Sequence, residues 1–199
     1  MRILTFFLVL LFLFPVAAAK ADVYVWKDPE SGMTMSYPDT WQKVSNQDPD
    51  TVITVLAPTA SDEAMCKVRV SPDARYVIFP PRYSSAVQKV AYSSDFWKEY
   101  LYGQYTDVMI HQVKDQAGLG RGFASYMLST YTTQGEDAAL KTSIGFATLY
   151  YDNAYVLECS ALAGAFENWL GMFQSIAKSV DFEKAHHELV IGNFEDFLN

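Results

Sequence analysis

Histidine and cysteine are scarce in this sequence. Three histidines and two cysteines occur among 199 residues, and two of the histidines, His186 and His187, lie close to the C-terminus. No G-x-S-x-G elbow is present, and neither cysteine has a reactive setting. Nucleophilic catalysis requires a nucleophile held beside a base, so the sequence predicts a protein that is not an enzyme.

Signals for a metal or a cofactor are also weak. His187 and Glu183 are four residues apart, but a metal site rarely consists of two ligands. The glycine-rich segment 118–122 resembles a phosphate-binding loop, yet the residues after it have strand character. Such loops open a helix whose N-terminal amides meet the phosphate, so we interpret this segment as a hairpin turn and expect no cofactor.

Basic residues are too few to form a polyanion-binding surface. The chain has 15 Lys and Arg against 23 Asp and Glu, a formal net charge of −8, and no local cluster of basic residues. An acidic surface repels phosphate backbones and anionic lipids, which argues against nucleic acid as a partner and against polybasic membrane docking. Charged residues make up 19% of the chain and aromatic residues 15%, a composition typical of a folded domain.

A long apolar run occurs at the N-terminus. Arg2 precedes an apolar stretch that ends in Ala17-Ala18-Ala19-Lys20-Ala21. A basic start, an apolar core and small residues at an A-x-A site predict a cleavable signal peptide over residues 1–21, cut after Ala21 or Ala19. A retained anchor helix is the alternative, but Pro15 and the small residues favour processing. We therefore expect a periplasmic or secreted protein, with no stable membrane insertion after cleavage and no lipid anchor.

The two cysteines, Cys66 and Cys159, each lie on the apolar face of a predicted strand. Export places them in an oxidising compartment, where an even number of cysteines favours a disulfide. Two separate buried thiols that act as small apolar side chains are the alternative.

Strand patterns dominate the central part of the chain and predict an α+β fold. The connections between the later strands are too short for helical crossovers, so we expect an antiparallel meander sheet of about six to eight strands. Trp41 is interpreted as a core residue. The predicted strands are 23–26, 33–37, 52–57, 65–70, 108–113, 123–132, 142–151 and 154–162.

Helical periodicity appears in two regions. Residues 83–105 have apolar residues at helical spacing, in one helix or in two helices broken near Ser93. The second region has a single apolar stripe and predicts a helix that lies flat on the sheet. Its stripe consists of Phe166, Trp169, Leu170, Phe173, Ile176, Ala177 and Val180.

The run Gly32-Met33-Thr34-Met35-Ser36-Tyr37-Pro38-Asp39-Thr40-Trp41 resembles a signature of the PsbP-like superfamily, which includes PsbP and the DcrB-type periplasmic proteins. The element order over about residues 23–182 is also similar. The resemblance implies an α/β/α sandwich, in which helices flank the antiparallel sheet, and a binding or accessory role. It transfers no functional residue. We therefore divide the chain into a signal peptide (1–21), one PsbP-like domain (22–182) and an acidic amphipathic tail (183–199).

Two regions are candidate interaction surfaces. The segment 83–105 has more aromatic residues than one buried helical stripe can hide, so we expect some of these rings to be exposed. The candidate residues there are Tyr92, Trp97, Tyr100 and Tyr102. In the tail, Phe194 and Phe197 lie at helical spacing opposite acidic residues, as in an amphipathic docking segment. Packing of the tail on its own domain is the alternative.

These observations lead to two hypotheses about function. The first is a non-enzymatic exported accessory or binding protein of the bacterial cell envelope, which acts through contacts with an unidentified envelope protein. The alternative is a small-ligand-binding periplasmic protein with a pocket between the sheet and the aromatic helices. That pocket would be lined by Trp97, Tyr100 and Tyr105.

Overall fold

The computed structural model describes residues 22–45, 48–78 and 83–182. The predicted signal peptide and the predicted tail, with Phe194 and Phe197, lie outside the described residues. The described part contains a two-stranded and a seven-stranded antiparallel sheet, flanked by helices. The α+β fold with an antiparallel sheet, predicted from sequence, is confirmed.

The smaller sheet is a hairpin of β1 (Val23–Lys27) and β2 (Thr34–Pro38). The larger sheet has the spatial order β3-β4-β5-β9-β8-β7-β6. Its strands are β3 (Gln42–Lys43), β4 (Thr51–Leu56), β5 (Met65–Pro72), β6 (Thr106–Leu119), β7 (Gly122–Thr132), β8 (Leu140–Tyr150) and β9 (Asn153–Leu162). Glycine-containing segment 118–122 forms the tight β6–β7 turn, as predicted.

The larger sheet consists of two meanders that meet along one seam. Strands β3 to β5 form the first meander and β6 to β9 the second, and among the described strands β5 and β9 are the pair that joins them. Cys66 lies directly opposite Cys159 in this pair, and the two form a disulfide. The disulfide interpretation of the two cysteines is therefore confirmed, and the covalent link lies in the seam.

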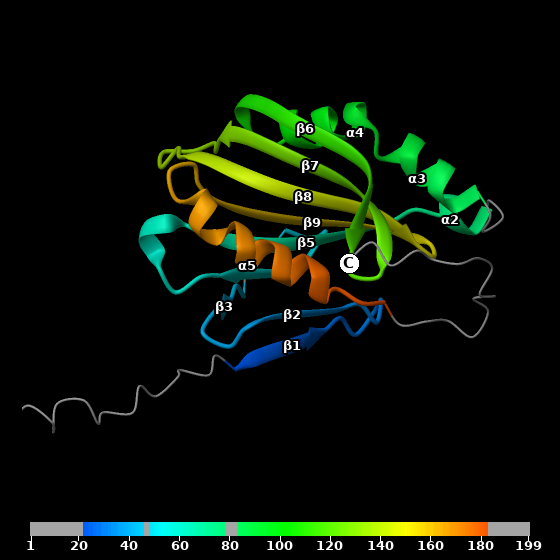
Figure 1. Cartoon of the computed structure of the whole chain (residues 1–199), viewed down its shortest axis with the longest axis horizontal. Helices are drawn as coiled ribbons and strands as arrows, with labels where there is room; N and C mark the ends of the chain where they lie inside the picture. Colours follow the sequence, from blue (N-terminus) through cyan, green and yellow to red (C-terminus); the bar gives the residue numbers. More distant parts are fainter. Residues whose placement is uncertain (1–21, 46–47, 79–82, 183–199) are drawn as a thin grey trace, which may run out of the picture.

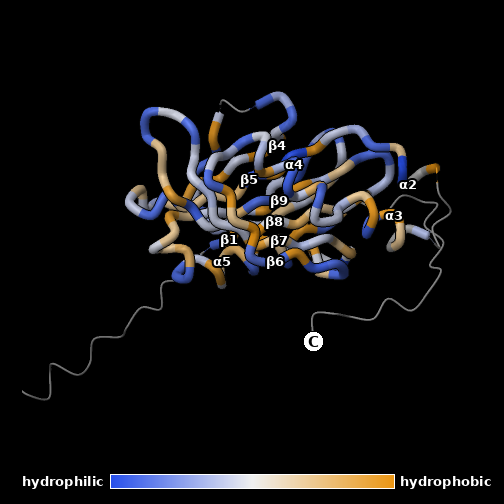
Figure 2. Tube along the Cα trace, turned by 90° about the horizontal axis from the view of Figure 1, so that it is seen from above, coloured by the Kyte–Doolittle hydropathy of each residue, from blue (hydrophilic) through white to orange (hydrophobic). Residues whose placement is uncertain are grey.

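One face of the large sheet is covered by α5 (Phe166–Ser179) and by the β1–β2 hairpin (Figure 1). Trp41 is buried here and packs edge-on against the rings of Trp169 and Phe173. The predicted apolar stripe of α5 thus faces the sheet. Hydropathy along the chain follows the same arrangement, since apolar segments run through the central strands and hydrophilic residues gather in the loops (Figure 2).

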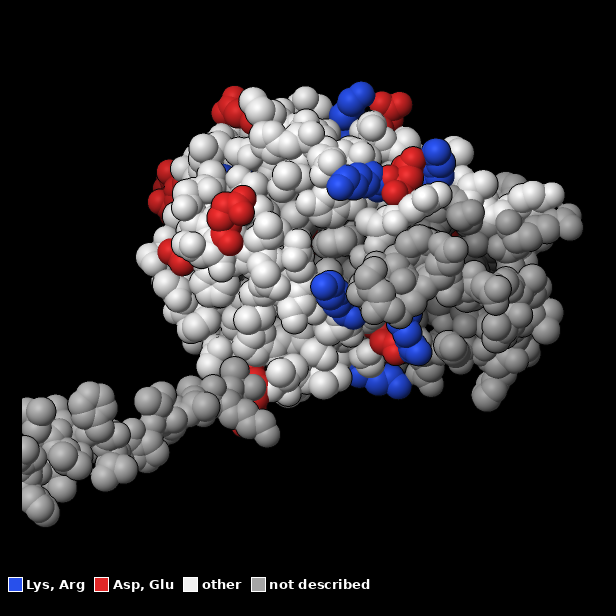
Figure 3. All heavy atoms as spheres, in the orientation of Figure 1, with Lys and Arg blue, Asp and Glu red and all other residues white. Residues whose placement is uncertain are grey.

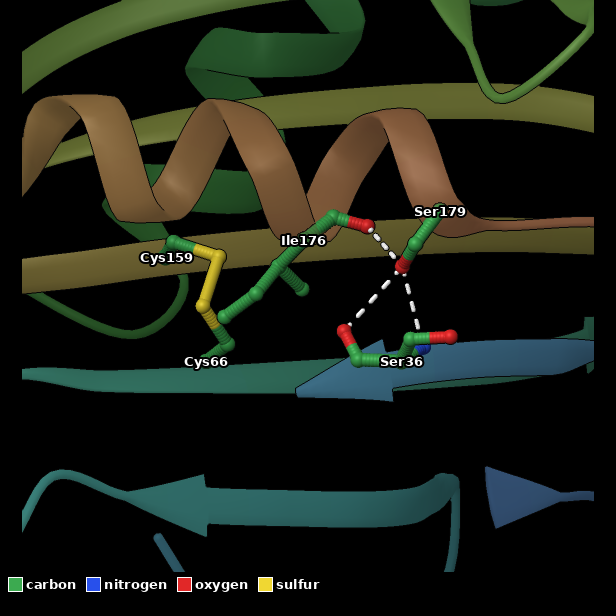
Figure 4. The surroundings of a disulfide bond; sticks show 5 residues. All are labelled: Ser36, Cys66, Cys159, Ile176 and Ser179. Atoms are coloured by element: carbon green, nitrogen blue, oxygen red, sulfur yellow. Dashed lines mark hydrogen bonds between the residues drawn. A yellow bond between two sulfur atoms is a disulfide. The ribbon is translucent and has the colours of Figure 1, made fainter. Parts of the chain in front are cut away.

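The outer edge of β2 is closed by the end of α5. The Ser36 amide donates to Ser179 Oγ at 2.9 Å, and that oxygen also lies within hydrogen-bonding distance of the Ser36 and Ile176 carbonyls (Figure 4). Beyond the helix, Thr34 and Asp181 exchange two backbone hydrogen bonds. The chain after α5 therefore runs alongside β2 and fixes the hairpin to the rest of the molecule.

The opposite face of the large sheet carries the short helices α2 (Arg75–Ile78), α3 (Ser84–Ala91) and α4 (Ser94–Tyr102). Helices α3 and α4 meet near Ser93, at the predicted break. The Trp97 indole nitrogen donates to Ser125 Oγ at 2.9 Å, so this buried polar atom is satisfied. Most contacts of these helices with the sheet are to β6, β7 and β8, and Tyr100 of α4 also reaches Glu158 of β9.

The proposal that Tyr92 and Trp97 form an interaction surface is wrong, because both side chains are buried in the core between the helices and the sheet. Leu101 lies one turn after Trp97 and is buried on the same helical face. Residues 83–105 contain many aromatic side chains, but the largest of them, Trp97, packs over Gly145 of the sheet and is not exposed.

We expect Gly145→Ala to destabilise the protein by about 1–3 kcal/mol, the usual cost of overpacking a core. A methyl group at this position would lie 2.9 Å from the rigid indole ring of Trp97 and 2.8 Å from the Met127 methyl group. Urea denaturation measures the change. Gly171→Ala is the matched control, because this α5 position has open space around it and alanine favours the helix, so stability should rise by up to about 1 kcal/mol. Equal stability of the Gly145 variant and the parent would contradict the packing.

None of the helices within the described ranges is both long enough and apolar enough to cross a membrane. On the visible part of the α5 face, charged side chains are sparse, and several of the basic ones lie beside an acidic one (Figure 3).

Candidate functional site

A buried carboxylate lies at the seam of the sheet, on the face opposite α5. Lys67 of β5 and Glu158 of β9 are direct cross-strand partners, one residue along each strand from the disulfide. Successive side chains of a strand point to opposite faces, so the cysteines point towards α5 while Lys67 and Glu158 point away from it. Glu158 is almost completely buried and Lys67 largely so.

Three tyrosine hydroxyls and the Lys67 ammonium surround the Glu158 carboxylate. We call these five residues the carboxylate cage: Lys67, Tyr100, Tyr105, Tyr131 and Glu158. Lys67 Nζ lies 3.1 Å from Glu158 Oε2, and the Tyr100 hydroxyl donates to the same oxygen at 3.0 Å. The Tyr131 hydroxyl donates to Oε1 at 2.8 Å, and the Tyr105 hydroxyl lies 3.3 Å from both oxygens.

The cage draws its members from separate parts of the fold. Tyr100 lies on α4, Tyr105 directly precedes β6, and Tyr131 lies on β7. The Tyr105 and Tyr131 rings stack with their centroids 3.7 Å apart, and Lys67 Nζ donates to the Tyr105 hydroxyl at 2.8 Å. One carboxylate therefore links the seam of the sheet to the helical layer and to the β6–β7 half.

The electrostatic environment keeps Glu158 ionised. Burial alone would raise the pKa of Glu158, but the Lys67 ammonium and the tyrosine hydroxyls outweigh it and hold the pKa below its ordinary value. Burial would likewise lower the pKa of Lys67, but the adjacent carboxylate raises it above its ordinary value. The pair is therefore charged on both sides at neutral pH.

The tyrosines of the cage remain protonated donors. Burial, and after it the charge of Glu158, raises the pKa of Tyr100 and of Tyr131 well above the ordinary value. Each of these two hydroxyls donates a hydrogen bond to the carboxylate, which thus accepts hydrogen bonds on both of its oxygens. A carboxylate that is held in this way has little capacity to accept a proton from a substrate, so the geometry favours a structural role for the cage.

Next to the cage, a hollow of about 540 Å³ lies over β4 and β5, whereas α3 and α4 pack mainly on the β6–β8 half. It is an open depression with both apolar and polar walls. We call it the open groove, and its lining residues are Val44, Asp48, Thr51, Thr54, Leu56, Met65 and Lys67.

A smaller and more enclosed cavity of about 130 Å³ adjoins the open groove, since Met65 and Lys67 line both. Its wall includes Tyr105, Tyr131 and Lys141. The Lys141 ammonium pairs with the Glu63 carboxylate at 2.8 Å, as Lys67 pairs with Glu158. Each cation on this wall thus has a carboxylate partner, and the cavity does not present an uncompensated positive charge.

Of the other residues that we predicted for an interaction surface or a pocket, some are exposed as expected and others are buried. Tyr102 is 61% exposed, as expected for an interaction surface, whereas Tyr100 is largely buried in the cage. The pocket that was predicted between the sheet and the aromatic helices is lined by Tyr105 but not by Trp97 or Tyr100, because Trp97 is packed over Gly145.

Sequence reasoning missed Glu158 as a site residue. A signal was present, because Glu158 is the one charged residue in the strand segment 154–162. Its cross-strand partner Lys67 alternates with the apolar residues Cys66 and Val68 along its own strand. The missing information was the pairing of β5 with β9, which brings the two charges together across 91 residues of sequence, close to the 93 of the disulfide.

Comparisons with known proteins identify the fold. No protein-family model and no curated protein matches the chain. Among solved structures, cyanobacterial PsbP (CyanoP) from Synechocystis sp. PCC 6803 is similar, with a TM-score of 0.51 and 13% identity over 85% of this chain and 98% of that chain. A Bacteroides thetaiotaomicron protein gives a TM-score of 0.49 at 13% identity, over 80% of this chain and 48% of that one. LpqN of Mycobacterium tuberculosis, described as involved in cell envelope biogenesis, gives 0.44 at 11% identity, covering 82% and 91%.

The chain therefore has a PsbP-like fold, as the Gly32–Trp41 motif predicted. Its seven-stranded antiparallel sheet, with α5 on one face and α2–α4 on the other, is the architecture that the resemblance implied. At 13% identity the likeness concerns the fold, and a function has to be argued from the site itself.

Proposed function

We propose that this chain is an exported, non-enzymatic binding protein of the bacterial cell envelope, which holds a partner protein at the open groove. The observation that carries the proposal is the open groove over β4 and β5, where Val44, Leu56 and Met65 supply apolar surface between polar groups. Soluble proteins usually cover such a face, and an open depression suits a protein surface better than a small molecule, which prefers an enclosed cavity.

Two further observations support the proposal. The Cys66–Cys159 disulfide is typical of a protein that folds in an oxidising compartment outside the cytoplasm. In the carboxylate cage, both oxygens of Glu158 already accept hydrogen bonds and Lys67 pairs with the carboxylate, so Glu158 is poorly suited to act as a base. Binding, rather than proton transfer, is the role that this arrangement favours.

Site-specific photocrosslinking tests the groove. We expect a photoreactive side chain at Leu56 to capture one defined envelope protein in the producing organism. The matched control is the same side chain at Met172, because Met172 is 37% exposed and Leu56 is 38% exposed, but Met172 lies on α5 on the other face. Equal capture from both positions, or none from Leu56, would contradict the proposal.

A second candidate function is the binding of a small ligand in the cavity beside the carboxylate cage. It is favoured by the enclosed shape of that cavity and by the hydroxyl and ammonium groups in its wall. Native mass spectrometry of the purified protein distinguishes the two functions. A stoichiometric small molecule that is lost in a Tyr131→Phe variant, together with no crosslink from Leu56, would favour the ligand.

A further inference from the structure

Among the described residues, no strand pairs with the outer edge of β1, which we call the free edge; it is exposed and apolar. Val23 and Val25 are 63% and 62% exposed, and Tyr24 between them is also exposed. In the hydrogen-bonding pattern with β2, the Asp28 amide donates to the Met33 carbonyl and the Asp39 amide donates to the Asp22 carbonyl.

This pattern fixes the direction of each backbone group. Antiparallel partners alternate between hydrogen-bonded and non-hydrogen-bonded pairs, so the backbone groups of Tyr24 and Trp26 face β2. The amides and carbonyls of Val23 and Val25 therefore point outward, along the free edge.

The other strand edges within the described ranges are protected. The outer edge of β2 is closed by Ser179 and Asp181, and β3 is two residues long. The long outer strand β6 is interrupted by three register shifts and has positive φ angles at Asp107 and Gln116. Short edges and bulges are the usual means of preventing strand addition. The edge of β1 has neither protection, and it is apolar.

We propose that the free edge of β1 is covered by the chain's own C-terminal segment 188–191, added as a third strand of the hairpin. This segment reads Glu-Leu-Val-Ile and is followed by Gly192, so it combines strand-forming residues with a residue that weakens a helix. Strand addition satisfies the outward amides and carbonyls of Val23 and Val25 and removes their apolar side chains from water.

The C-terminal segment can reach the free edge of β1 from the position where the described chain ends. Asp181 pairs with Thr34 at the turn end of the hairpin, and the chain runs antiparallel to β2 there (Figure 1). A chain that passes round the turn and reverses would run antiparallel to β1. The new strand position lies three strand spacings from Asp181, roughly 14 Å. From residue 182, the last described residue, to residue 188 there are six extended steps, about 20 Å, which is enough to bring residue 188 to the edge.

Amide hydrogen exchange in the full exported chain tests the proposal. We expect a Val190→Asp, Ile191→Asp variant to exchange the Val25 amide on the order of tenfold faster than the parent, because the added strand is lost. The Trp26 amide is the internal control, since it bonds to β2 and should change little. Equal exchange of the Val25 amide in the parent and the variant overturns the proposal.

Cysteine crosslinking distinguishes the occupants of the edge. With Val25→Cys and Val190→Cys in one chain, we expect a crosslink within the monomer, whereas the control pair of Met172→Cys and Val190→Cys should form none. A crosslinked dimer would identify a second copy as the occupant, and the absence of a crosslink would exclude the tail. Either of these two results overturns the proposal.

Discussion

Removal of the disulfide should cost about 4–5 kcal/mol of stability, the loop-entropy value for a link that closes 93 residues. The Cys66→Ala, Cys159→Ala variant leaves the seam between β5 and β9 to be held by backbone hydrogen bonds and side-chain packing. For a domain with a net stability of roughly 5–15 kcal/mol, this is a large fraction. Urea denaturation should show a midpoint lower by about 2 M.

The reduced parent protein is the matched control for this variant. Both cysteines are completely buried, so reduction has to be carried out in the unfolded state before refolding in the presence of reductant. The reduced parent and the double variant should unfold at similar urea concentrations, both well below the oxidised parent. If the oxidised and reduced parents unfolded at the same concentration, the stabilising role of the seam disulfide would be excluded.

Lys67→Met should destabilise the protein by about 3–5 kcal/mol at neutral pH, since it leaves the buried Glu158 carboxylate without its cation. Methionine replaces most of the aliphatic part of the lysine side chain, so the loss reports mainly the charge rather than a cavity. Combining Lys67→Met with Glu158→Gln should recover most of the stability, because a neutral amide still accepts bonds from the tyrosines. Urea denaturation of the parent, both single variants and the double variant measures the coupling. Additive losses would contradict a direct Lys67–Glu158 interaction.

The pH dependence of stability provides an independent test of the interactions that keep Glu158 ionised. The pKa of Glu158 is lowered in the folded protein, so its contribution is fully present above the unfolded value of about 4.3. As the pH falls below that value and through the folded pKa, the unfolded state takes up its proton first and the contribution is lost. Glu158→Gln should therefore lose less stability than the parent on acidification from pH 5 to pH 2. An identical pH profile would exclude the lowered pKa.

Much of the fold could be predicted from local sequence patterns. The strict alternation of Met33 to Tyr37 predicted a half-buried strand, and β2 follows that alternation of burial. The apolar stripe of α5 and the break near Ser93 were also found. The strand predicted at 108–113 is much longer in the structure, Thr106–Leu119, because its bulges interrupt the alternation on which a strand prediction depends. Strand β3 is too short to leave a pattern.

The carboxylate cage was harder to predict from the sequence, because it depends on the order of the strands in the sheet. Lys67 and Glu158 each look like an ordinary polar residue on a strand, and their neighbourhood follows from the β5–β9 pairing, which no local signal encodes. The error with Tyr92 and Trp97 has a similar cause. The number of rings in residues 83–105 was judged against a single buried helical stripe, whereas Gly145 on a distant strand provides space for the largest ring.

The position of the disulfide between the two meanders also has a consequence for folding kinetics. Strands β6 to β9 pair with their neighbours in sequence through short connections, so this half can form quickly from local contacts. We expect the pairing of β5 with β9 to form later, because its residues are distant in the chain and closing the long loop costs more entropy. Cys66 and Cys159 meet only in that last pairing. The disappearance of free thiols during oxidative refolding should therefore report when the two halves of the sheet join.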